Sequence, residues 1–112
     1  AIVHDIGIKE SMKKYGDSAG HHQEQEGPAV AENMLERLGY EGDIIKRVCY
    51  LVGHHHTYSN IDGIDYQILV EADFLVNFYE DNLAKDAIDT ALQKIFRTEA
   101  GKTLCRLCYI ND

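Results

Sequence analysis

The sequence predicts an all-α protein. Apolar residues recur at helical spacing in several segments, whereas no segment alternates apolar and polar residues with period two. The chain has 112 residues, 45% of them hydrophobic, and contains one proline. A chain of this length and composition fits one domain with a buried core, so we expect a single domain over residues 1–112.

The first segment looks like the end of a helix. Residues 1–5 run from three apolar positions into a polar pair, and Gly7 is expected to end the helix. Because the chain begins without Met and without a helix-start signal, we expect the domain to be truncated at its N-terminus. Residues 8–23 are polar and are predicted to form a loop, with one short helix around Glu10–Lys14.

The next predicted helix begins near Glu26-Gly27-Pro28, because proline favours the first turn of a helix, and it ends at Gly39. Its inward positions follow helical spacing: Val30, Met34, Leu35 and Leu38. Asp43 is a suitable cap for the following helix, which runs directly into Gly53-His54-His55-His56. The apolar stripe of that helix comprises Ile44, Ile45, Val48, Leu51 and Val52.

Three helices are predicted in the second half of the chain. A loop over residues 57–64, marked by the turn signal Asp62-Gly63, separates them from the first half. Asp65 is expected to cap the first of them, and Asp73 lies near its predicted buried face, which comprises Ile68, Leu69, Ala72, Leu75, Val76 and Tyr79. The other two are expected at roughly 83–97 and 100–110, with inward positions at Ala84, Ala87, Ile88, Ala91, Leu92, Ile95, Leu104, Leu107 and Cys108.

Charge and cysteine content narrow the function classes. The formal net charge is −8, and an acidic chain is repelled by phosphate backbones, so we expect no broad binding to nucleic acid or to anionic membranes. An anionic substrate needs a local positive charge, and a bound metal is its simplest source. The odd count of three cysteines, with no signal peptide and no membrane-spanning run, predicts reduced thiols in the cytoplasm.

Several polar residues interrupt the apolar stripes. They are His4, Asp5, the run His54–His56 and Asp73. Burying an ionised carboxylate without a partner is costly, so such residues are expected to be paired or to bind metal. Imidazole and carboxylate are ligand types that suit Zn, Fe, Mn, Ni and Co.

These motifs together resemble the HD superfamily of metal-dependent phosphohydrolases. Ala1-Ile2-Val3-His4-Asp5-Ile6-Gly7 is similar to its His-Asp signature, and Glu71-Ala72-Asp73-Phe74-Leu75 is similar to its closing Ala-Asp motif. Val52-Gly53-His54-His55-His56 resembles the helix-end histidines of members with two metals, and Glu26-Gly27-Pro28 resembles a segment that is often His-Gly-Pro. The resemblance covers residues 1 to about 80 and implies an HD-domain helical bundle of about five or six helices.

The resemblance implies roles for these residues. His4, Asp5 and Asp73 are expected to hold a first divalent ion (Mn, Fe, Co, Ni, Mg or Zn), and Asp5 to bridge to a second. Glu26 and the histidine run are expected at the second ion, with His55 favoured over His54 and then His56, because His55 continues the stripe of Val48 and Val52.

Hydrolysis of a phosphate mono- or diester, commonly of a nucleotide, is the implied activity, driven by metal-activated water. Asp5, His55 and His54 are the expected catalytic residues. A histidine from either the 54–56 cluster or the 21–22 cluster is expected to act as general acid. A small phosphorylated substrate is therefore the expected partner, and a homodimer is an open alternative because the terminal helices have apolar faces.

Two features depart from the family pattern. The first metal ligand of the superfamily is a histidine upstream of the His-Asp pair, and this chain has no residue there. Ile8 stands where extended motifs have Lys, and Lys9 is one position away.

Two other functions stay open. The first is a di-iron HD-fold oxygenase, with which a glutamate at position 26 is compatible. The second is a catalytically degenerate HD domain that acts as a sensor or interaction module. Cys105 and Cys108 have C-x₂-C spacing without a second pair, so core packing is favoured over zinc binding.

Overall fold

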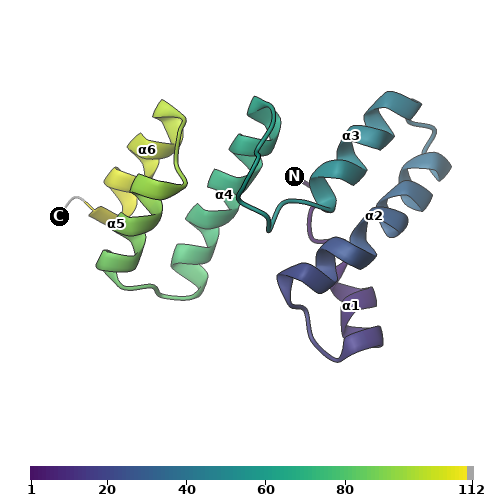
Figure 1. Ribbon diagram of the computed structural model, residues 1–112, viewed down its shortest axis with the longest axis horizontal. Helices are drawn as coiled ribbons and strands as arrows, with labels where there is room; N and C mark the ends of the chain where they lie inside the picture. Colours follow the sequence, from purple (N-terminus) through teal and green to yellow (C-terminus); the bar gives the residue numbers. More distant parts are fainter. Residues whose placement is uncertain (111–112) are drawn as a thin grey trace. The chain divides into compact units, whose positions relative to one another are not determined.

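The computed structural model describes residues 1–110, and helices are the only regular elements in this range. The prediction of an all-α fold with about five or six helices is confirmed, since this range contains six α-helices (Figure 1). The chain forms two compact units, Ala1–Thr57 and Tyr58–Asp112. Within the described range, no helix has the length and apolar character that crossing a bilayer requires.

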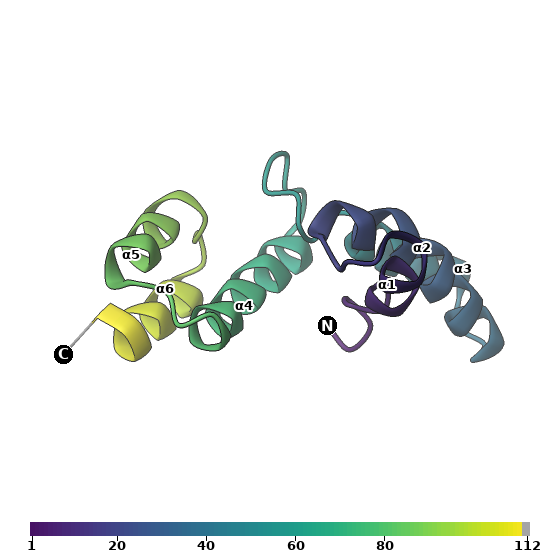
Figure 2. The same ribbon diagram turned by 90° about the horizontal axis from the view of Figure 1, so that it is seen from below.

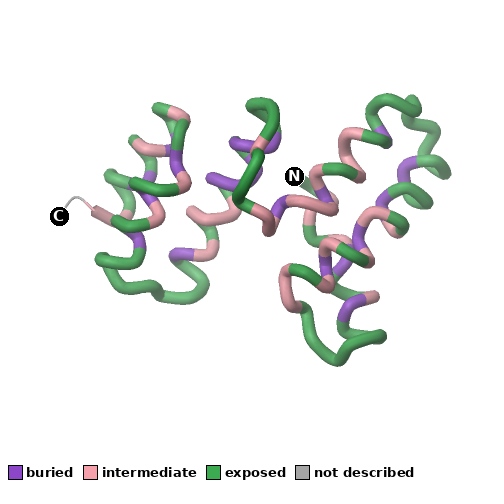
Figure 3. Tube along the Cα trace, viewed as in Figure 1, coloured by how far each residue is buried: buried purple, intermediate pink, exposed green. Residues whose placement is uncertain are grey.

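The first unit contains α1 (Ile8–Tyr15), α2 (Gly20–Arg37) and α3 (Gly42–Val52). The central helix α2 packs against both of the others (Figure 1). Its buried positions are four residues apart and so form one face: Gln23, Gly27, Ala31 and Leu35 (Figure 3).

Two glycines allow the helices of this unit to approach closely. A Cβ atom on Gly7 would lie 2.6 Å from the carbonyl oxygen of Gln23 and 2.9 Å from the Cα of Gly27. A Cβ atom on Gly27 would lie 2.5 Å from Cγ1 of Val52. Because both glycines lack a side chain, the residue before α1 contacts the backbone of α2, and Val52 of α3 packs closely on Gly27.

The boundaries in the first unit differ from the sequence prediction at its beginning. Residues 1–7 form successive turns instead of the end of a helix, and Gly7 precedes α1 instead of ending a helix. The short helix predicted around Glu10–Lys14 is present as part of the longer α1. The loop predicted over the rest of residues 8–23 is limited to residues 16–19, because α2 already begins at Gly20. Pro28 lies inside α2, where its fixed φ is compatible with the helix although it donates no hydrogen bond.

Later boundaries agree better with the sequence. Gly39 has φ +80° and follows Leu38, the C-cap residue of α2, as expected of a glycine that ends a helix. Helix α3 runs into the histidine run as predicted, but its N-cap is Glu41, and Asp43 lies within its first turn.

The second unit contains α4 (Ile64–Glu80), α5 (Lys85–Lys94), α6 (Glu99–Cys105) and the π-helical turn η1 (Arg106–Ile110). The turn η1 continues from α6 and packs beside α5, and α6 contacts α4 (Figure 2). One core joins these elements, and its buried members are Phe78, Ile88, Leu92, Phe96 and Cys105.

A buried carboxylate on α4 supports the loop before α6. Glu71 is 2% exposed and accepts hydrogen bonds from the backbone amides of Arg97 and Thr98, from the Thr98 hydroxyl and from the Gln67 amide. Burial by itself raises the pKa of Glu71, but the four hydrogen bonds outweigh it and hold the pKa below its ordinary value. Glu71 is therefore an ionised structural group in the second unit.

The predicted buried face of α4 is partly wrong. Leu69 is buried as expected, but Ile68, Ala72, Val76 and Tyr79 are exposed. The buried positions are instead Tyr66, Gln67, Leu69, Val70, Glu71 and Phe78. Apolar residues occur on nearly every side of α4, so helical periodicity alone does not select its inward face.

Candidate metal centre

In the first unit, the carboxylate of Asp5 lies between two imidazole rings. Nε2 of His4 is 3.1 Å from Oδ2 of Asp5, and Nε2 of His55 is 3.4 Å from Oδ1. The two rings meet edge to face, with centroids 5.2 Å apart. The opening turns supply His4 and Asp5, and the turn after α3 supplies His55, so residues about fifty positions apart in the sequence meet here.

Backbone hydrogen bonds orient both rings in the same way. Nδ1 of His4 lies 2.6 Å from the carbonyl oxygen of Ala1, and Nδ1 of His55 lies 2.9 Å from that of Val52. A carbonyl oxygen only accepts, so Nδ1 carries the proton in each ring. In the neutral imidazole, Nε2 then has a lone pair, and this is the atom that faces Asp5.

The environment of His55 is unusual. The residue is 0% exposed, and its Nε2 atom has no hydrogen-bond partner among the described residues. A buried polar atom without a partner is costly, and a lone pair directed at a carboxylate oxygen is repelled by it. A positive centre between the two atoms, either a proton or a metal ion, removes both penalties.

The third histidine of the run forms another side of the cluster. Asp5, His55 and His56 each offer a ligand atom, and the three atoms lie within 4.8 Å of one another. Nε2 of His56 is 3.2 Å from Oε1 of Gln23, and the His56 amide donates to Glu24. The Thr57 hydroxyl donates to the same Glu24 carboxylate, which thereby fixes the turn that carries the histidines.

The donor set and its spacing fit a divalent ion. Imidazole nitrogens and carboxylate oxygens bind such ions at about 2.1 Å, which separates two tetrahedral donors by about 3.4 Å. The distances from Asp5 to the two rings are close to this value. Asp5 is 45% exposed, so the cluster opens to solvent on the side of this carboxylate.

Comparison of the chain with known protein families, with characterised proteins and with solved structures gives no match. The resemblance to the HD superfamily therefore remains a hypothesis that depends on the motifs and on the geometry of the cluster.

Two of the expected metal ligands in the first unit lie away from Asp5. His54, also expected to be catalytic, points back along α3: its Nδ1 is 2.6 Å from the carbonyl oxygen of Tyr50, and its ring stacks on the Tyr50 ring. Glu26 accepts hydrogen bonds from the Lys14 ammonium at 2.7 Å and the Tyr15 hydroxyl at 2.9 Å. The hydrogen bond from Lys14 has the largest effect on the pKa of Glu26, and together with that from Tyr15 it holds this pKa below its ordinary value.

Asp73 lies half-buried in the middle of α4, in the second unit. Its expected approach to His4 and Asp5 concerns residues of different units and stays a prediction.

The other histidine pair begins α2. Nδ1 of His22 is 2.6 Å from Oδ1 of Asp17, and the His22 ring stacks on Tyr15 with centroids 3.8 Å apart. The His22 ring and the Ala19 amide hold the pKa of Asp17 below its ordinary value. These contacts stabilise the turn between α1 and α2, and His21 is exposed beside it.

Sequence reasoning missed Gln23 and Glu24 and ranked His56 last. A signal for Gln23 was present, because it belongs to the same four-residue series as Gly27, Ala31 and Leu35. Starting the helix at Glu26 removed one turn of α2 from that series. Glu24 has no comparable signal, since its contacts depend on the turn after α3.

Proposed function

We propose that this chain is a metal-dependent phosphohydrolase that acts on a phosphate mono- or diester, with a nucleotide as the favoured substrate class. His4, Asp5 and His55 are the proposed ligands in the first unit, with His56 beside them. One observation carries the proposal: the buried Nε2 atom of His55 has no hydrogen-bond partner among the described residues and lies 3.4 Å from Asp5 Oδ1.

The tautomer of His55 supports a metal ion over a fully paired structural histidine. Its Nδ1 proton is used by the Val52 carbonyl, which leaves Nε2 as an electron-pair donor. A backbone carbonyl that accepts from the ring nitrogen opposite the binding atom is typical of metal-binding histidines. The Ala1 carbonyl orients His4 in the same manner.

The residues divide the work by chemistry. The histidines bind through neutral nitrogens, and Asp5 contributes negative charge and a solvent-exposed oxygen on the open side. A bound divalent ion supplies Lewis acidity, lowers the pKa of water and neutralises phosphate oxygens, which an acidic chain otherwise repels. His56, held by Gln23, is the nearest further imidazole and the proposed proton donor to the leaving oxygen.

The oxygenase alternative has less support. A glutamate at position 26 was compatible with an iron site, but the Glu26 carboxylate accepts hydrogen bonds from Lys14 and Tyr15. We therefore propose the hydrolase and treat a non-catalytic metal sensor as an outcome of the test.

The test combines metal binding with phosphate release. The chain is stripped with chelator and titrated calorimetrically with Mn, Co, Ni and Mg in turn, and each form is assayed on nucleotides and on an aryl phosphate. His55→Gln and Asp5→Asn are the test variants. His21→Gln and Asp43→Asn are matched controls, because these two side chains are exposed and lie outside the cluster.

We expect at least one ion to bind. Both test variants should weaken the binding of that ion about tenfold or more, because each removes a direct ligand. The controls are expected to bind like the wild type. Metal binding without phosphate release from any substrate would overturn the hydrolase and favour a sensor. Equal binding by His55→Gln and wild type would overturn the metal centre itself, and a proton shared with Asp5 would then explain the contact.

A further inference from the structure

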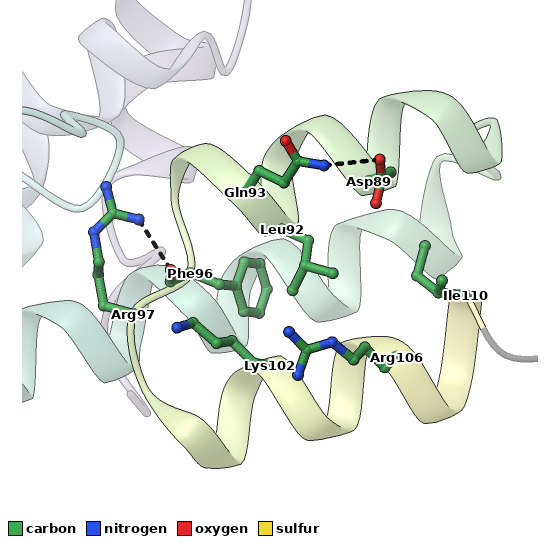
Figure 4. A pocket seen from close by; sticks show the side chains of 8 residues that line it. All are labelled: Asp89, Leu92, Gln93, Phe96, Arg97, Lys102, Arg106 and Ile110. Atoms are coloured by element: carbon green, nitrogen blue, oxygen red, sulfur yellow. Dashed lines mark hydrogen bonds between the residues drawn. The ribbon is translucent and has the colours of Figure 1, made fainter.

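The second unit has a basic pocket, in which cationic side chains face an apolar floor. Its charged lining comprises Arg97, Lys102, Arg106 and Asp89, and its floor includes Leu92 and Phe96 (Figure 4). We propose that this pocket binds the phosphate group of a small phosphorylated molecule through Lys102 and Arg106. The proposal does not depend on the metal centre, because all of these residues belong to the second unit.

The charge distribution of the unit is the first argument. Residues 58–112 contain five Lys and Arg residues against ten Asp and Glu residues. Three of those five cations line this one pocket. An acidic chain repels anions over most of its surface, so a local concentration of cations offers an anion one favourable place.

The two central cations are available to a ligand. Arg106 is exposed, and no ion pair joins it to another residue in the range 1–110. Among residues 1–110, Lys102 forms its ion pair with Glu99, which is 90% exposed and lies 3.9 Å away, so the pair is weak. The two residues are four positions apart, and Figure 4 shows both side chains extending on the same side of their helix, below Phe96.

Arg97 has a different part. Its guanidinium donates to the carbonyl oxygens of Lys94 and Phe96 at the end of α5, at 2.8 and 2.9 Å. These bonds fix the side chain and leave its charge in place, so it adds to the positive potential of the pocket. The guanidinium of Arg106 and the ammonium of Lys102 are the kinds of group with which proteins bind phosphate.

Size and the opposite rim define the ligand class. The pocket has a volume of about 460 Å³, which suits an organic phosphate better than a bare ion. Asp89 lies on the far rim, where it accepts a hydrogen bond from Gln93 at 3.1 Å. Its carboxylate disfavours a second anionic group there and favours a hydroxyl or amino group, so a sugar or nucleoside monophosphate fits the pocket best.

The experiment measures binding of three probes to the full chain by calorimetry, with excess EDTA present to silence the metal centre. AMP and inorganic phosphate separate an organic from a free phosphate, and adenosine lacks the phosphate. Lys102→Gln and Arg106→Gln are compared with Lys94→Gln and Arg37→Gln, which remove the same charges from exposed sites outside the pocket. Circular dichroism checks that each variant is folded.

We expect AMP to bind and adenosine not to bind. Lys102→Gln and Arg106→Gln should each weaken AMP about tenfold, the effect of one charge-assisted hydrogen bond, while the two controls stay near wild type. Asp89→Asn should tighten AMP, because it removes a negative charge from the rim. Phosphate binding as tight as AMP would support the same site for the free ion. No saturable binding of AMP or phosphate below about 1 mM, or equal losses in pocket and control variants, would overturn the proposal.

Discussion

Glu71 gives the sharpest test of how the second unit is held together. Its carboxylate accepts four hydrogen bonds, at 2.6 Å from the Gln67 amide and the Thr98 hydroxyl and at 2.9 and 3.0 Å from two backbone amides. Glu71→Gln keeps the shape of the side chain but removes its charge. Charged acceptors form bonds about 1 kcal/mol stronger than neutral ones, and the neutral amide recovers part of this through cheaper burial. We therefore expect Glu71→Gln to lower the free energy of unfolding by about 2 kcal/mol.

Glu71→Ala removes all four bonds and leaves buried donors without acceptors. At about 1–3 kcal/mol for each unsatisfied group, and without full additivity, we expect a loss of about 4 kcal/mol. Urea denaturation followed by far-UV circular dichroism measures both losses. Glu80→Gln is the matched control, since Glu80 is exposed on the same helix, and it should change little.

Acid provides an independent check of the sign. The folded-state pKa of Glu71 lies below the ordinary value of 4.5, so its contribution is fully present above that value. The contribution is lost as the pH falls through the folded-state pKa, and wild type and Glu71→Gln should then converge in stability. A Glu71→Gln variant as stable as Glu80→Gln at neutral pH, or a difference that does not shrink in acid, would refute this account.

Three other predictions concern packing and ionisable groups. Gly27→Ala should lower the free energy of unfolding by about 2 kcal/mol, because the new methyl group meets Val52. In urea titrations, a Gly27→Ala/Val52→Ala double variant should lose less stability than the sum of the single losses, and strict additivity would refute this. A thiol reagent should label the exposed Cys108 quickly in the folded chain. Burial raises the pKa of Cys105 and of Cys49, so the labelling of both should be slower, and equal labelling rates for all three thiols would contradict the structure. Tyr109→Phe should cost about 1 kcal/mol, because its hydroxyl donates to the Leu75 carbonyl at 2.6 Å. Burial raises the pKa of Tyr109, so the wild-type advantage should persist at neutral pH and disappear as the pH rises through the folded-state pKa, which unfolding titrations at alkaline pH measure.

Helical periodicity predicted the fold class and most of the helices, because apolar spacing is a local property of the chain. It failed where a helix is polar or apolar on all sides. The polar segment at residues 8–23 contains α1, of which only a short helix around Glu10–Lys14 was predicted, and the first turn of α2. The buried residue of α1 is the polar Ser11, so apolar spacing did not reveal the inward face of this helix. Helix α4 is apolar nearly all round, so its sequence did not exclude an outward Ile68 or Val76.

In the candidate site too, local patterns identified some residues, and others depend on contacts between distant segments. His4 and Asp5 are adjacent in the sequence, and His55 continues the stripe of α3, so short motifs sufficed to select all three. Glu26 was selected by similarity to a motif, but Lys14 and Tyr15 from α1 bind its carboxylate, and no local pattern shows that contact. Residues whose roles depend on contacts between distant turns, such as Glu24, require the three-dimensional structure.

The contact of Gly7 with the backbone of α2 has a consequence for how this protein tolerates change. Gly7 follows the His-Asp pair after one residue, and it accepts no side chain because Gln23 and Gly27 occupy the space. A saturation library of the chain should thus show that Gly7 and Gly27, which carry no functional group, do not tolerate substitution. Variants that adjust the spacing of His4 and Asp5 must arise elsewhere, in the turns before Gly7 or in the residues behind the histidine rings.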